Sequence, residues 1–595
     1  MSSSRISLPG TKVWKEHRLW LSILSLALLC GLVFLWQLGD IGLIDETEPL
    51  FVEAARQMQE TGDWVTPYFN GVTRFDKPPL IYWLMAVADR LIGVNEWAAR
   101  LPSALSAIAL VGLSGYCLQC FGCPSLPSSA PPVPPEPSFP SQRPRSQRFS
   151  AVAWMGTAIL ILTPEMLVWG RIGVSDMLLT GCMGMALLAF FMGYARSEQP
   201  QQRRWYLLFF VLSALAVLTK GPVGIVLPGL IIGSFLLYQG CLRQVLREMP
   251  LLLGSSLFLL LTVPWYVLVI LANGEAYLDS FFGYHNFDRF TSTVNHHAGP
   301  WYFYFLVVLL GFAPWSVWLP WAMARLRFFN VAQWRGQPRS EQLGLFALHW
   351  FGGIFLFFTV AGTKLPSYVL PLMPAAAILV GGLAGQPRLR PRQHQWSALV
   401  SIVAHVVLLA TLAWACFNSL QWLGHDPDMP NFPQVVQQSG VMITGTMIWV
   451  GAAIASLILL WRRLRWLWTV DAIAIVLFIT LTLLPLLQLM DSQRQLPLRQ
   501  IATVIRAQQQ EEPIIYSGQK PSLVFYTQRP VIYIHTPKII SKEIQQRLKS
   551  AQPSVLVVGL KERLQELDLD PQRSVLLKDA GAYQLIRVQR SQPPI

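Results

Sequence analysis

About thirteen apolar stretches, each about 20 residues long, divide the chain and constrain its fold more than any other feature. A segment of that length crosses a lipid bilayer as an α-helix, because a helix satisfies its own backbone hydrogen bonds. We expect spans at 19–39, 98–119, 150–168, 177–195, 205–219, 222–239, 250–272, 301–322, 344–361, 367–385, 396–417, 440–460 and 467–489. The expected fold is a polytopic α-helical membrane protein with about 13 transmembrane helices.

The distribution of charge predicts how these spans are oriented. Only 13% of the residues are charged, against about 25% in soluble domains, and the net charge is +14. The excess arginine lies in short loops between spans, which is typical of cytoplasmic loops rather than of a nucleic-acid-binding surface. These loops contain Arg143, Arg145 and Arg148; Arg196, Arg203 and Arg204; Arg243 and Arg247; Arg325, Arg327, Arg335 and Arg339; Arg388, Arg390 and Arg392; and Arg462, Arg463 and Arg465. We expect a cytoplasmic N-terminus (residues 1–18), an uncleaved first span, contact with membrane lipids and no nucleic-acid partner.

The remaining loops carry the more unusual polar chemistry, and we expect them on the opposite, outer face. They are 40–97, 169–176, 219–222, 273–300 and 363–366. Strict alternation of the predicted spans does not place all of these loops on one side. Either a span boundary is wrong, or one short segment re-enters the membrane. A single active face is the simplest interpretation.

Two segments differ in composition from the transmembrane domain (19–489). Residues 122–148 are rich in proline and serine, which is typical of a disordered linker, here on the cytoplasmic side. Residues 490–595 turn polar and predict a small α/β domain, placed on the outer, periplasmic face by the odd number of spans. Its expected strands are 513–517, 531–534 and 555–559, and its expected helices lie near 521–527, 540–549 and 561–567.

The loop after the first span is the densest cluster of charged groups in the chain. Thr47 is expected to cap a short amphipathic helix that lies on the membrane. Asn70-Gly71, between two short β-type runs, predicts a hairpin with a type I′ turn. That hairpin would bring Asp76 and Lys77 back towards Asp45.

Four carboxylates are candidates for a catalytic base or for orienting an acceptor, namely Asp45, Glu46, Glu48 and Asp176. The first three could instead complement the dipole of the helix that follows them. Asp176 could simply cap the fourth span. Asp76-Lys77-Pro78-Pro79 adds a cation to the same loop, and this combination favours a functional role.

Four cations of the outer loops and span ends are candidates for binding a phosphate. Lys77, Lys220 and Lys364 are each followed closely by proline, and Arg171 lies in the loop before Asp176. A lysine at a span end can extend to the interface while its stem stays in apolar surroundings. In a tight turn it can instead meet a phosphate as a point charge.

The loop 273–300 combines histidines with an aspartate and an arginine. It contains Tyr284-His285-Asn286-Phe287-Asp288-Arg289-Phe290 and then Asn295-His296-His297. This group, across from Asp76, is compatible with a divalent-metal site, for which Asp76 and His285 are the candidate ligands. Arg289 could instead bind a phosphate through two N–H groups. The sequence indicates no other cofactor.

Cations suited to a lipid-borne phosphate and carboxylates suited to an acceptor, on one membrane face, fit transfer of a group from a phosphate-activated lipid. The alternative is a transporter or flippase of a lipid-linked substrate. A transporter predicts internal repeats and ionisable residues near mid-membrane. The sequence has no evident repeat, and its distinctive charges lie at span ends.

Several segments resemble the protein O-mannosyltransferase and lipid A aminoarabinose transferase group (PMT/ArnT-like) of GT-C glycosyltransferases. The resemblance covers spans one to ten, leaves out 122–148, and extends to the C-terminal region only in outline. The matching segments are Asp45-Glu46-Thr47-Glu48, Ala55-Arg56-Gln57-Met58, Thr61-Gly62-Asp63-Trp64-Val65-Thr66-Pro67, Asn70-Gly71, Lys77-Pro78-Pro79-Leu80 with Tyr82-Trp83, Ala99-Arg100-Leu101-Pro102-Ser103, Leu218-Thr219-Lys220-Gly221-Pro222, and Lys364-Leu365-Pro366-Ser367-Tyr368-Val369-Leu370-Pro371-Leu372 with Pro374.

This resemblance implies a GT-C fold and an inverting transfer of a sugar, a pentose, aminopentose or hexose, from a polyprenyl-phosphate donor. The acceptor would be a lipid, glycan or protein on the outer face of the cytoplasmic membrane. By position, Asp45 to Glu48 and Asp176 would supply the base. The donor phosphate would be held by Lys77, Arg289 and Lys364, and the set of substrate-binding candidates also includes Arg171, Lys220 and Tyr368.

Two positions depart from the family pattern. In the aminoarabinose enzymes the first motif ends Asp-Glu-Ala-Arg before an aromatic residue, and alignment on Phe51 places that Asp at Thr47 and that Arg at Leu50. The essential carboxylate would then be Asp45 or Glu48. The family's Glu-His before Arg-Phe falls at His285-Asn286, which changes the set of metal ligands.

Overall fold

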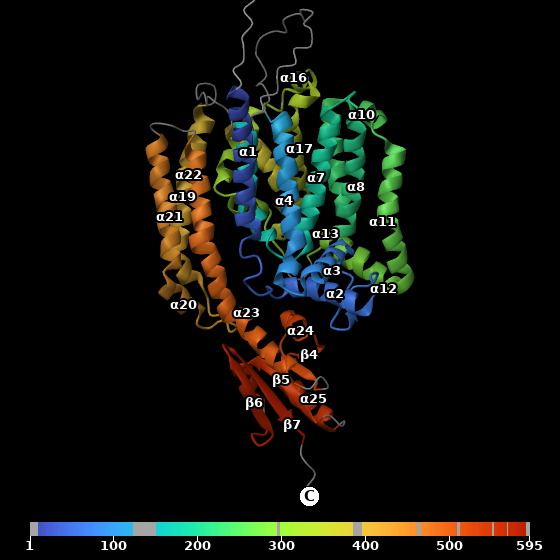
Figure 1. The fold of residues 1–595 in the computed structure, drawn as a ribbon, viewed down its shortest axis with the longest axis vertical. Helices are drawn as coiled ribbons and strands as arrows, with labels where there is room; N and C mark the ends of the chain where they lie inside the picture. The colour runs from blue at the N-terminus through green and yellow to red at the C-terminus, as the bar shows by residue number, and fades with distance from the viewer. Residues whose placement is uncertain are drawn as a thin grey trace, which may run out of the picture.

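The computed structural model of the chain describes residues 10–122, 150–293, 298–384, 395–460, 466–508, 512–549, 553–567 and 569–590. A bundle of long helices forms one part, and a small sheet domain forms the other, at one end of the bundle (Figure 1). The predicted linker beyond residue 122, the arginine groups at 143–148, 388–392 and 462–465, and Asn295 to His297 lie outside the described residues.

The bundle contains the helices expected from the apolar stretches, together with short 3-10 and π-helical segments (η). Its first half comprises α1 (Gly10–Cys30), η1 (Gly31–Leu35), α4 (Glu96–Phe121), α5 (Ala151–Ile161), α6 (Pro164–Trp169), α7 (Ser175–Ala195), α8 (Gln202–Lys220), α9 (Val223–Gln239), α10 (Leu242–Glu248) and α11 (Leu251–Asn273). Its second half comprises α12 (Glu275–Tyr277), η2 (Leu278–Asp288), α13 (Arg289–Thr291), α14 (Phe303–Gly311), η3 (Trp315–Trp318), α15 (Leu319–Arg325), α16 (Val331–Arg335), η4 (Arg339–Glu341), α17 (Leu343–Val360), η5 (Pro366–Leu372), α18 (Met373–Ala384), α19 (Gln395–Trp422), α20 (Phe432–Ser439), α21 (Val441–Leu460), α22 (Leu467–Phe478), η8 (Ile479–Leu483) and α23 (Leu484–Arg506).

The expected polytopic helical bundle is confirmed, but the expected number of about 13 spans is not. Within the described residues, eight helices are long and apolar enough to cross a membrane, or nine if one bent pair is counted as a span. Three further apolar helices are shorter. The predicted span 301–322 is the bent pair, in which Phe303–Gly311 and Trp315–Arg325 meet at 110°. A broken or re-entrant segment was one of the two explanations for the imperfect alternation of loops.

The first outer loop forms two helices joined by a hairpin. These are α2 (Thr47–Thr61), β1 (Tyr68–Phe69), β2 (Val72–Thr73) and α3 (Leu80–Ile92). Asn70 (φ 54°) and Gly71 (φ 80°) are both left-handed, as a type I′ turn requires, so the predicted hairpin is confirmed.

Two details of α2 differ from the prediction. Thr47 is the first helical residue rather than a side-chain cap, and the carboxylate of Glu48 instead accepts a hydrogen bond from the backbone N–H of Ile44 (2.8 Å). The apolar face of α2, which includes Phe51 and Met58, is buried in the protein core and does not lie on a membrane. Specific packing against neighbouring helices has replaced the expected contact with lipid.

The C-terminal domain is a five-stranded sheet in the order β4-β3-β5-β7-β6. Its elements are β3 (Ile514–Ser517), α24 (Pro521–Thr527), β4 (Val531–Ile534), α25 (Pro537–Lys549), β5 (Ser554–Leu560), α26 (Lys561–Gln565), β6 (Ser574–Ala580) and β7 (Tyr583–Gln589). β3 is parallel to β4 and β5, whereas β7 is antiparallel to β5 and β6. The sequence predicted β3, β4 and β5 but missed the β6–β7 hairpin. β6 lies at the sheet edge, and Val575 and Leu576 in it are both exposed, so it has no alternating pattern to detect.

One continuous helical stretch joins the bundle to the sheet domain. The helical segment Leu467–Arg506 is 40 residues long, or about 60 Å, twice the thickness of a bilayer core. Its final turns pack against the sheet through Leu498, Ile501 and Ile505. The predicted boundary at residue 490 therefore falls inside α23, near the place where the helix exceeds the length of one span.

Several hydrogen bonds join the sheet domain to the first outer loop. The side-chain amide of Asn70 pairs with the backbone of Val531 in the edge strand β4, donating to its carbonyl (2.8 Å) and accepting from its N–H (2.9 Å). Asp45 accepts hydrogen bonds from Ser522, and the Tyr526 hydroxyl accepts one from the N–H of Leu43. These bonds hold the domain over the loop that carries Lys77.

Replacing Asn70 should loosen this attachment without changing the turn. We expect Asn70→Gly to keep φ > 0 but to lose both bonds to Val531, which lowers the local opening free energy of β4 by about 1–3 kcal/mol. Hydrogen exchange of the amides of 531–534 measures this change, with the β5 amides of the same sample as the internal control. Unchanged exchange in β4 would show that Asn70 does not hold the domain.

Candidate functional site

A cavity of about 240 Å³ lies where the outer loops meet the ends of several bundle helices. Its lining includes residues just before α3 and in α13, two elements at the end of the bundle that faces the sheet domain (Figure 1). Its lining combines three cations with many apolar side chains. It is lined by Asp76, Lys77, Leu179, Lys220, Pro222, Val223, Val226, Leu227, Phe281, His285, Asn286, Arg289, Phe290, Phe357, Phe358, Ala361, Ser367, Tyr368 and Pro371.

The three cations of this cavity come from segments far apart in the sequence. Lys77, before α3, is buried, and its ammonium donates to the carbonyl of Asp76 (2.8 Å). Lys220, at the end of α8, forms an ion pair with Asp176 (2.6 Å) and lies over the ring of Tyr368 (5.2 Å). Arg289 begins α13, and its buried Nε has no hydrogen-bond partner within the described residues. A pocket with cations left in excess is suited to an anion.

Asp76 compensates part of this charge. Its carboxylate accepts hydrogen bonds from Arg74 (2.5 Å) and the Tyr82 hydroxyl (2.9 Å), and it lies 3.8 Å from the ammonium of Lys77. Burial raises the pKa of Asp76, but the charges of Arg74 and Lys77 outweigh burial and hold that pKa at about 2. Asp76 is therefore ionised, and its role in the described structure is to orient cations.

Burial and neighbouring cations also shift two basic groups of the cavity. Burial lowers the pKa of Lys77 to about 8, helped by the charges of Lys220 and Arg289 and opposed by Asp76. Burial lowers the pKa of His285 to about 4, and the charge of Lys77 adds to this effect. At neutral pH, Lys77 is still mostly charged, whereas His285 is neutral.

The structure brings the two candidate metal ligands to one cavity without assembling a recognisable metal centre. His285 interacts electrostatically with Asp76, and its buried Nδ1 has no hydrogen-bond partner in the part of the chain described. Among the described residues there is no group of three or more His, Cys, Asp or Glu side chains placed to hold a metal ion. His296 and His297 fall outside those residues, so a divalent metal at Asp76 and His285 stays a prediction.

Within the described residues, Asp76 and Lys77 form no hydrogen bond or ion pair with Asp45, so their expected approach to Asp45 stays a prediction. Asp45 accepts from the N–H (2.9 Å) and the hydroxyl (2.5 Å) of Ser522 in the sheet domain, and burial raises its pKa. The hairpin tip is bound to β4, and the chain that follows it lines the cavity. Asp45 is therefore bound to the sheet domain, whereas Lys77 faces the cavity. Glu46 is exposed.

Glu48 is held in a dense buried network instead of facing the cavity. Arg100 of α4 donates two hydrogen bonds to its carboxylate (2.7 and 2.8 Å), and the N–H groups of Ile44 and Gly173 donate two more (2.8 and 2.7 Å). Both members of the ion pair are fully buried. A carboxylate with four donors stabilises the surrounding loops, and its predicted catalytic role stays a prediction.

Two of the predicted phosphate-binding cations point elsewhere. Arg171 donates to the carbonyls of Val33 and Gln37 (3.0 Å each), and burial lowers its pKa to about 10. Lys364 donates to the carbonyls of Thr359 and Ala361 at the end of α17. Neither lines the cavity, because each is used to satisfy backbone oxygens that a helix end leaves free.

Several residues of the site had no role in the sequence-based prediction. Arg74 and Tyr82 fix Asp76, Asn286 and Ser367 line the cavity, and Arg100 anchors Glu48. The family-like motifs include Tyr82, Arg100 and Ser367, so the sequence did mark these positions. It did not show which residues they contact, because those partners lie on other segments.

One ionisable pair inside the bundle was also missed. His405 of α19 and Asp471 of α22 are both fully buried, with His405 Nε2 3.3 Å from Asp471 Oδ1. The ring of His405 lies against Trp318 of the bent pair (5.5 Å between centroids). Distinctive ionisable groups therefore do not lie only at span ends, as the sequence had indicated. Each member of the pair is an isolated polar residue in an apolar stretch, so nothing in the sequence indicated the pairing. The pair does not line the cavity.

Comparison with known proteins follows the same division into bundle and sheet domain. Residues 146–268 match the family described as dolichyl-phosphate-mannose-protein mannosyltransferase, and residues 507–593 match the cyanobacterial RgtA-type glycosyltransferase C-terminal domain. These matches support a PMT/ArnT-like GT-C glycosyltransferase. They agree with the expected polytopic fold with a small C-terminal domain, and they do not support the transporter alternative.

Two curated relatives of the chain have the same name, undecaprenyl phosphate-alpha-4-amino-4-deoxy-L-arabinose arabinosyl transferase. The protein of Aeromonas salmonicida is 28% identical over 60% of this chain and 59% of its own length. The protein of Edwardsiella ictaluri is 26% identical over 80% of this chain and 79% of its own length. The first alignment thus spans only about three fifths of the relative.

A solved structure agrees in fold along nearly the whole chain. The crystal structure of ArnT from Cupriavidus metallidurans bound to undecaprenyl phosphate superposes with a TM-score of 0.73 at 24% identity. The match covers 95% of this chain and 97% of the ArnT chain, including the sheet domain. The same protein in its apo state gives a TM-score of 0.72.

The hydrogen bonds of Glu48 predict that this residue stabilises the fold, and a substitution can test this structural role. Glu48→Gln removes the charge that Arg100 faces, and breaking a buried pair costs about 3–5 kcal/mol. We expect a clear fall in the thermal unfolding midpoint of the purified protein. Glu46→Gln, an exposed position in the same loop, is the matched control and should change stability by less than about 0.5 kcal/mol. Equal midpoints for the two variants would contradict the structural assignment of Glu48.

Proposed function

We propose that this chain transfers a sugar from a polyprenyl-phosphate donor to an acceptor on the membrane face that carries the sheet domain. The observation that carries this proposal is the cavity that joins Lys77, Lys220 and Arg289 to an apolar wall. That wall ends in Val226 and Phe290, which are 44% and 42% exposed on the outside of the bundle. A charged head and an apolar tail can therefore occupy one continuous site.

The cations of the cavity would bind the donor phosphate and stabilise it as it leaves. Asp76 and Asp176 each pair with a lysine, and Arg289 supplies a further positive charge. Negative charge on the phosphate increases as the bond to the sugar breaks, so fixed cations stabilise the transition state more than the ground state. Tyr368 lies under Lys220 and limits where that ammonium can point.

The reaction would be a single inverting displacement. An acceptor oxygen forms a bond to the anomeric carbon while the bond from that carbon to the phosphate oxygen breaks, and the polyprenyl phosphate leaves with the electron pair. A hydroxyl acceptor must also give its proton to a base, whereas an ionised phosphate acceptor needs none. Asp176 is the predicted carboxylate beside the cavity cations, so we place it first, ahead of Asp45, Glu46 and Glu48.

The names of the relatives suggest the substrates. Relatives named for undecaprenyl phosphate and 4-amino-4-deoxy-L-arabinose favour an undecaprenyl-phosphate donor carrying a pentose or aminopentose, with a hexose as the broader alternative. The acceptor would be a lipid, a glycan or a protein. We place the enzyme in the inner membrane with a cytoplasmic N-terminus and a periplasmic sheet domain. A divalent metal, if used, would be bound at Asp76 and His285.

Transfer by reconstituted protein tests the proposal. The full-length protein in lipid vesicles would be given undecaprenyl-phosphate sugars, and mass spectrometry would detect released undecaprenyl phosphate and glycosylated acceptor. Lys77→Ala and Arg289→Ala should each lower kcat/KM by about 100-fold or more, as loss of a fixed transition-state charge does. Lys538→Ala, an exposed change on α25, is the control. Transfer that survives both cavity substitutions would refute the phosphate site, and no transfer from any polyprenyl-phosphate sugar would refute the function.

The lowered pKa of Lys77 predicts a particular pH dependence. Because that pKa is about 8, Lys77 loses its proton as the pH rises through 8, and the cavity then binds the donor phosphate less well. We expect kcat/KM to fall above about pH 8 in the unmodified protein. Lys77→Arg keeps its charge and should shift this fall beyond pH 10. A flat profile up to pH 9.5 in the unmodified protein would exclude Lys77 as the titrating group.

A further inference from the structure

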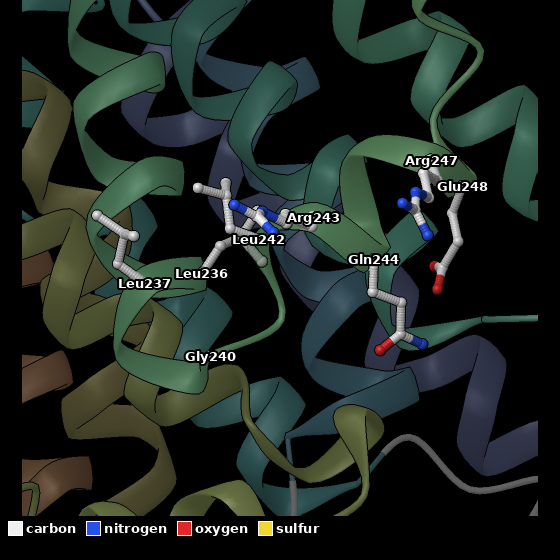
Figure 2. Close-up of a pocket in the computed structure, with 8 residues that line it drawn as sticks. All are labelled: Leu236, Leu237, Gly240, Leu242, Arg243, Gln244, Arg247 and Glu248. Carbon is white, nitrogen blue, oxygen red and sulfur yellow. The ribbon is translucent and has the colours of Figure 1, made fainter.

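A second cavity, of about 710 Å³, lies at the turn between α9 and α10. In Figure 1 α10 is at the end of the bundle opposite the sheet domain, far from the cavity of Lys77 and Arg289. Figure 2 shows its lining, in which leucines stand on one side and polar side chains on the other. The lining residues are Leu236, Leu237, Gly240, Leu242, Arg243, Gln244, Arg247 and Glu248.

The short helix α10 is amphipathic and presents two arginines together. Val245 is fully buried, whereas Arg243, Gln244 and Arg247 are exposed. Residues four apart on a helix lie on the same face with their Cβ atoms about 6 Å apart, so the guanidinium groups of Arg243 and Arg247 can reach one ligand. Within the described part of the chain neither arginine has a hydrogen bond or an ion pair.

The single acidic residue in this lining is already neutralised. Glu248 accepts two hydrogen bonds from Arg339 (2.7 and 3.0 Å) and one from Gln202 (3.0 Å). Arg339 in turn lies over the ring of Tyr194 (4.8 Å). Glu248 therefore fixes the end of α10 and leaves the charges of Arg243 and Arg247 uncompensated.

The position of the cavity relative to exposed leucines indicates a lipid ligand. Leu237, near the end of α9, is 63% exposed, and Leu252, near the start of α11, is 87% exposed. Both belong to apolar helices, α9 and α11, and an apolar surface of this kind is covered by acyl chains in a membrane. The arginines of α10 lie between these two apolar helices, a position that is typical of cations that meet lipid head groups.

We propose that the α9–α10 cavity is a binding site for an anionic glycerophospholipid. Arg243 and Arg247 would hold the phosphate through paired N–H donors, and the exposed Leu237 would contact the first part of an acyl chain. Two uncompensated guanidinium groups favour a lipid of net negative charge over a zwitterionic one, whose cationic head group they repel. The site is independent of the proposed transfer reaction.

Native mass spectrometry of the full-length protein in mild detergent tests this site. Titration with phosphatidylglycerol should give at least about tenfold tighter binding than titration with phosphatidylcholine, a difference within the range of charge-assisted hydrogen bonds. The double variant R243A/R247A should lose that preference. R203A/R204A, a matched pair of exposed arginines on the same face but outside the cavity, should keep it.

A second variant separates a paired guanidinium site from simple charge. R243K/R247K keeps both charges but loses the fork of N–H donors, so phosphatidylglycerol binding should weaken several-fold while the unfolding midpoint is unchanged. Equal loss of preference in R243A/R247A and R203A/R204A would overturn the proposal in favour of diffuse surface charge. Equal binding of the two lipids by the unmodified protein, or of inorganic phosphate and phosphatidylglycerol, would also overturn it.

Discussion

The buried ion pair of Arg100 and Glu48 is the contact on which the active face depends. Arg100 also donates to the carbonyls of Leu38, Ile41 and Gly42, so one guanidinium joins α4 to the chain that leads into α2. Desolvating such a pair is costly unless the remaining donors and acceptors are satisfied, and here they are. The pair sets the start of α2 and the approach to α7, and with them the positions of Lys77 and Asp176.

The charges on the two faces of the bundle follow different physical requirements. On the face towards the sheet domain, cations are gathered in an enclosed cavity, and burial lowers the pKa of Lys77 because a charge there is costly without an anion. On the opposite face, Arg243 and Arg247 are exposed and cost little when unpaired. The first arrangement suits a ligand that must be held while charge develops, and the second suits one that is simply retained.

Hydrogen bonds to backbone and side-chain groups attach the sheet domain to the outer loops. Asn70 pairs with β4 much as a neighbouring strand would, and Asp45 receives two hydrogen bonds from Ser522. The continuous helical stretch from Leu467 to Arg506 fixes the distance between membrane and sheet. A domain attached at both the hairpin and this helix lies over the outer loops.

The sequence by itself determined the helical membrane fold, the hairpin at Asn70-Gly71 and three strands of the C-terminal domain, because periodicity and turn chemistry are local properties. It also placed Lys77, Lys220 and Arg289 among the candidates for binding a phosphate, because cations in turns next to proline and in motif-like segments can be recognised from the sequence alone. Only the tertiary structure decided that these three share a cavity while Lys364 and Arg171 bind carbonyls, and that Asp45 bonds to Ser522, 477 residues away. It also revealed the partners of Glu48 and the buried pair His405–Asp471. The physical reason is that a buried charge is placed by its partner, and a partner on another segment leaves no trace in local sequence.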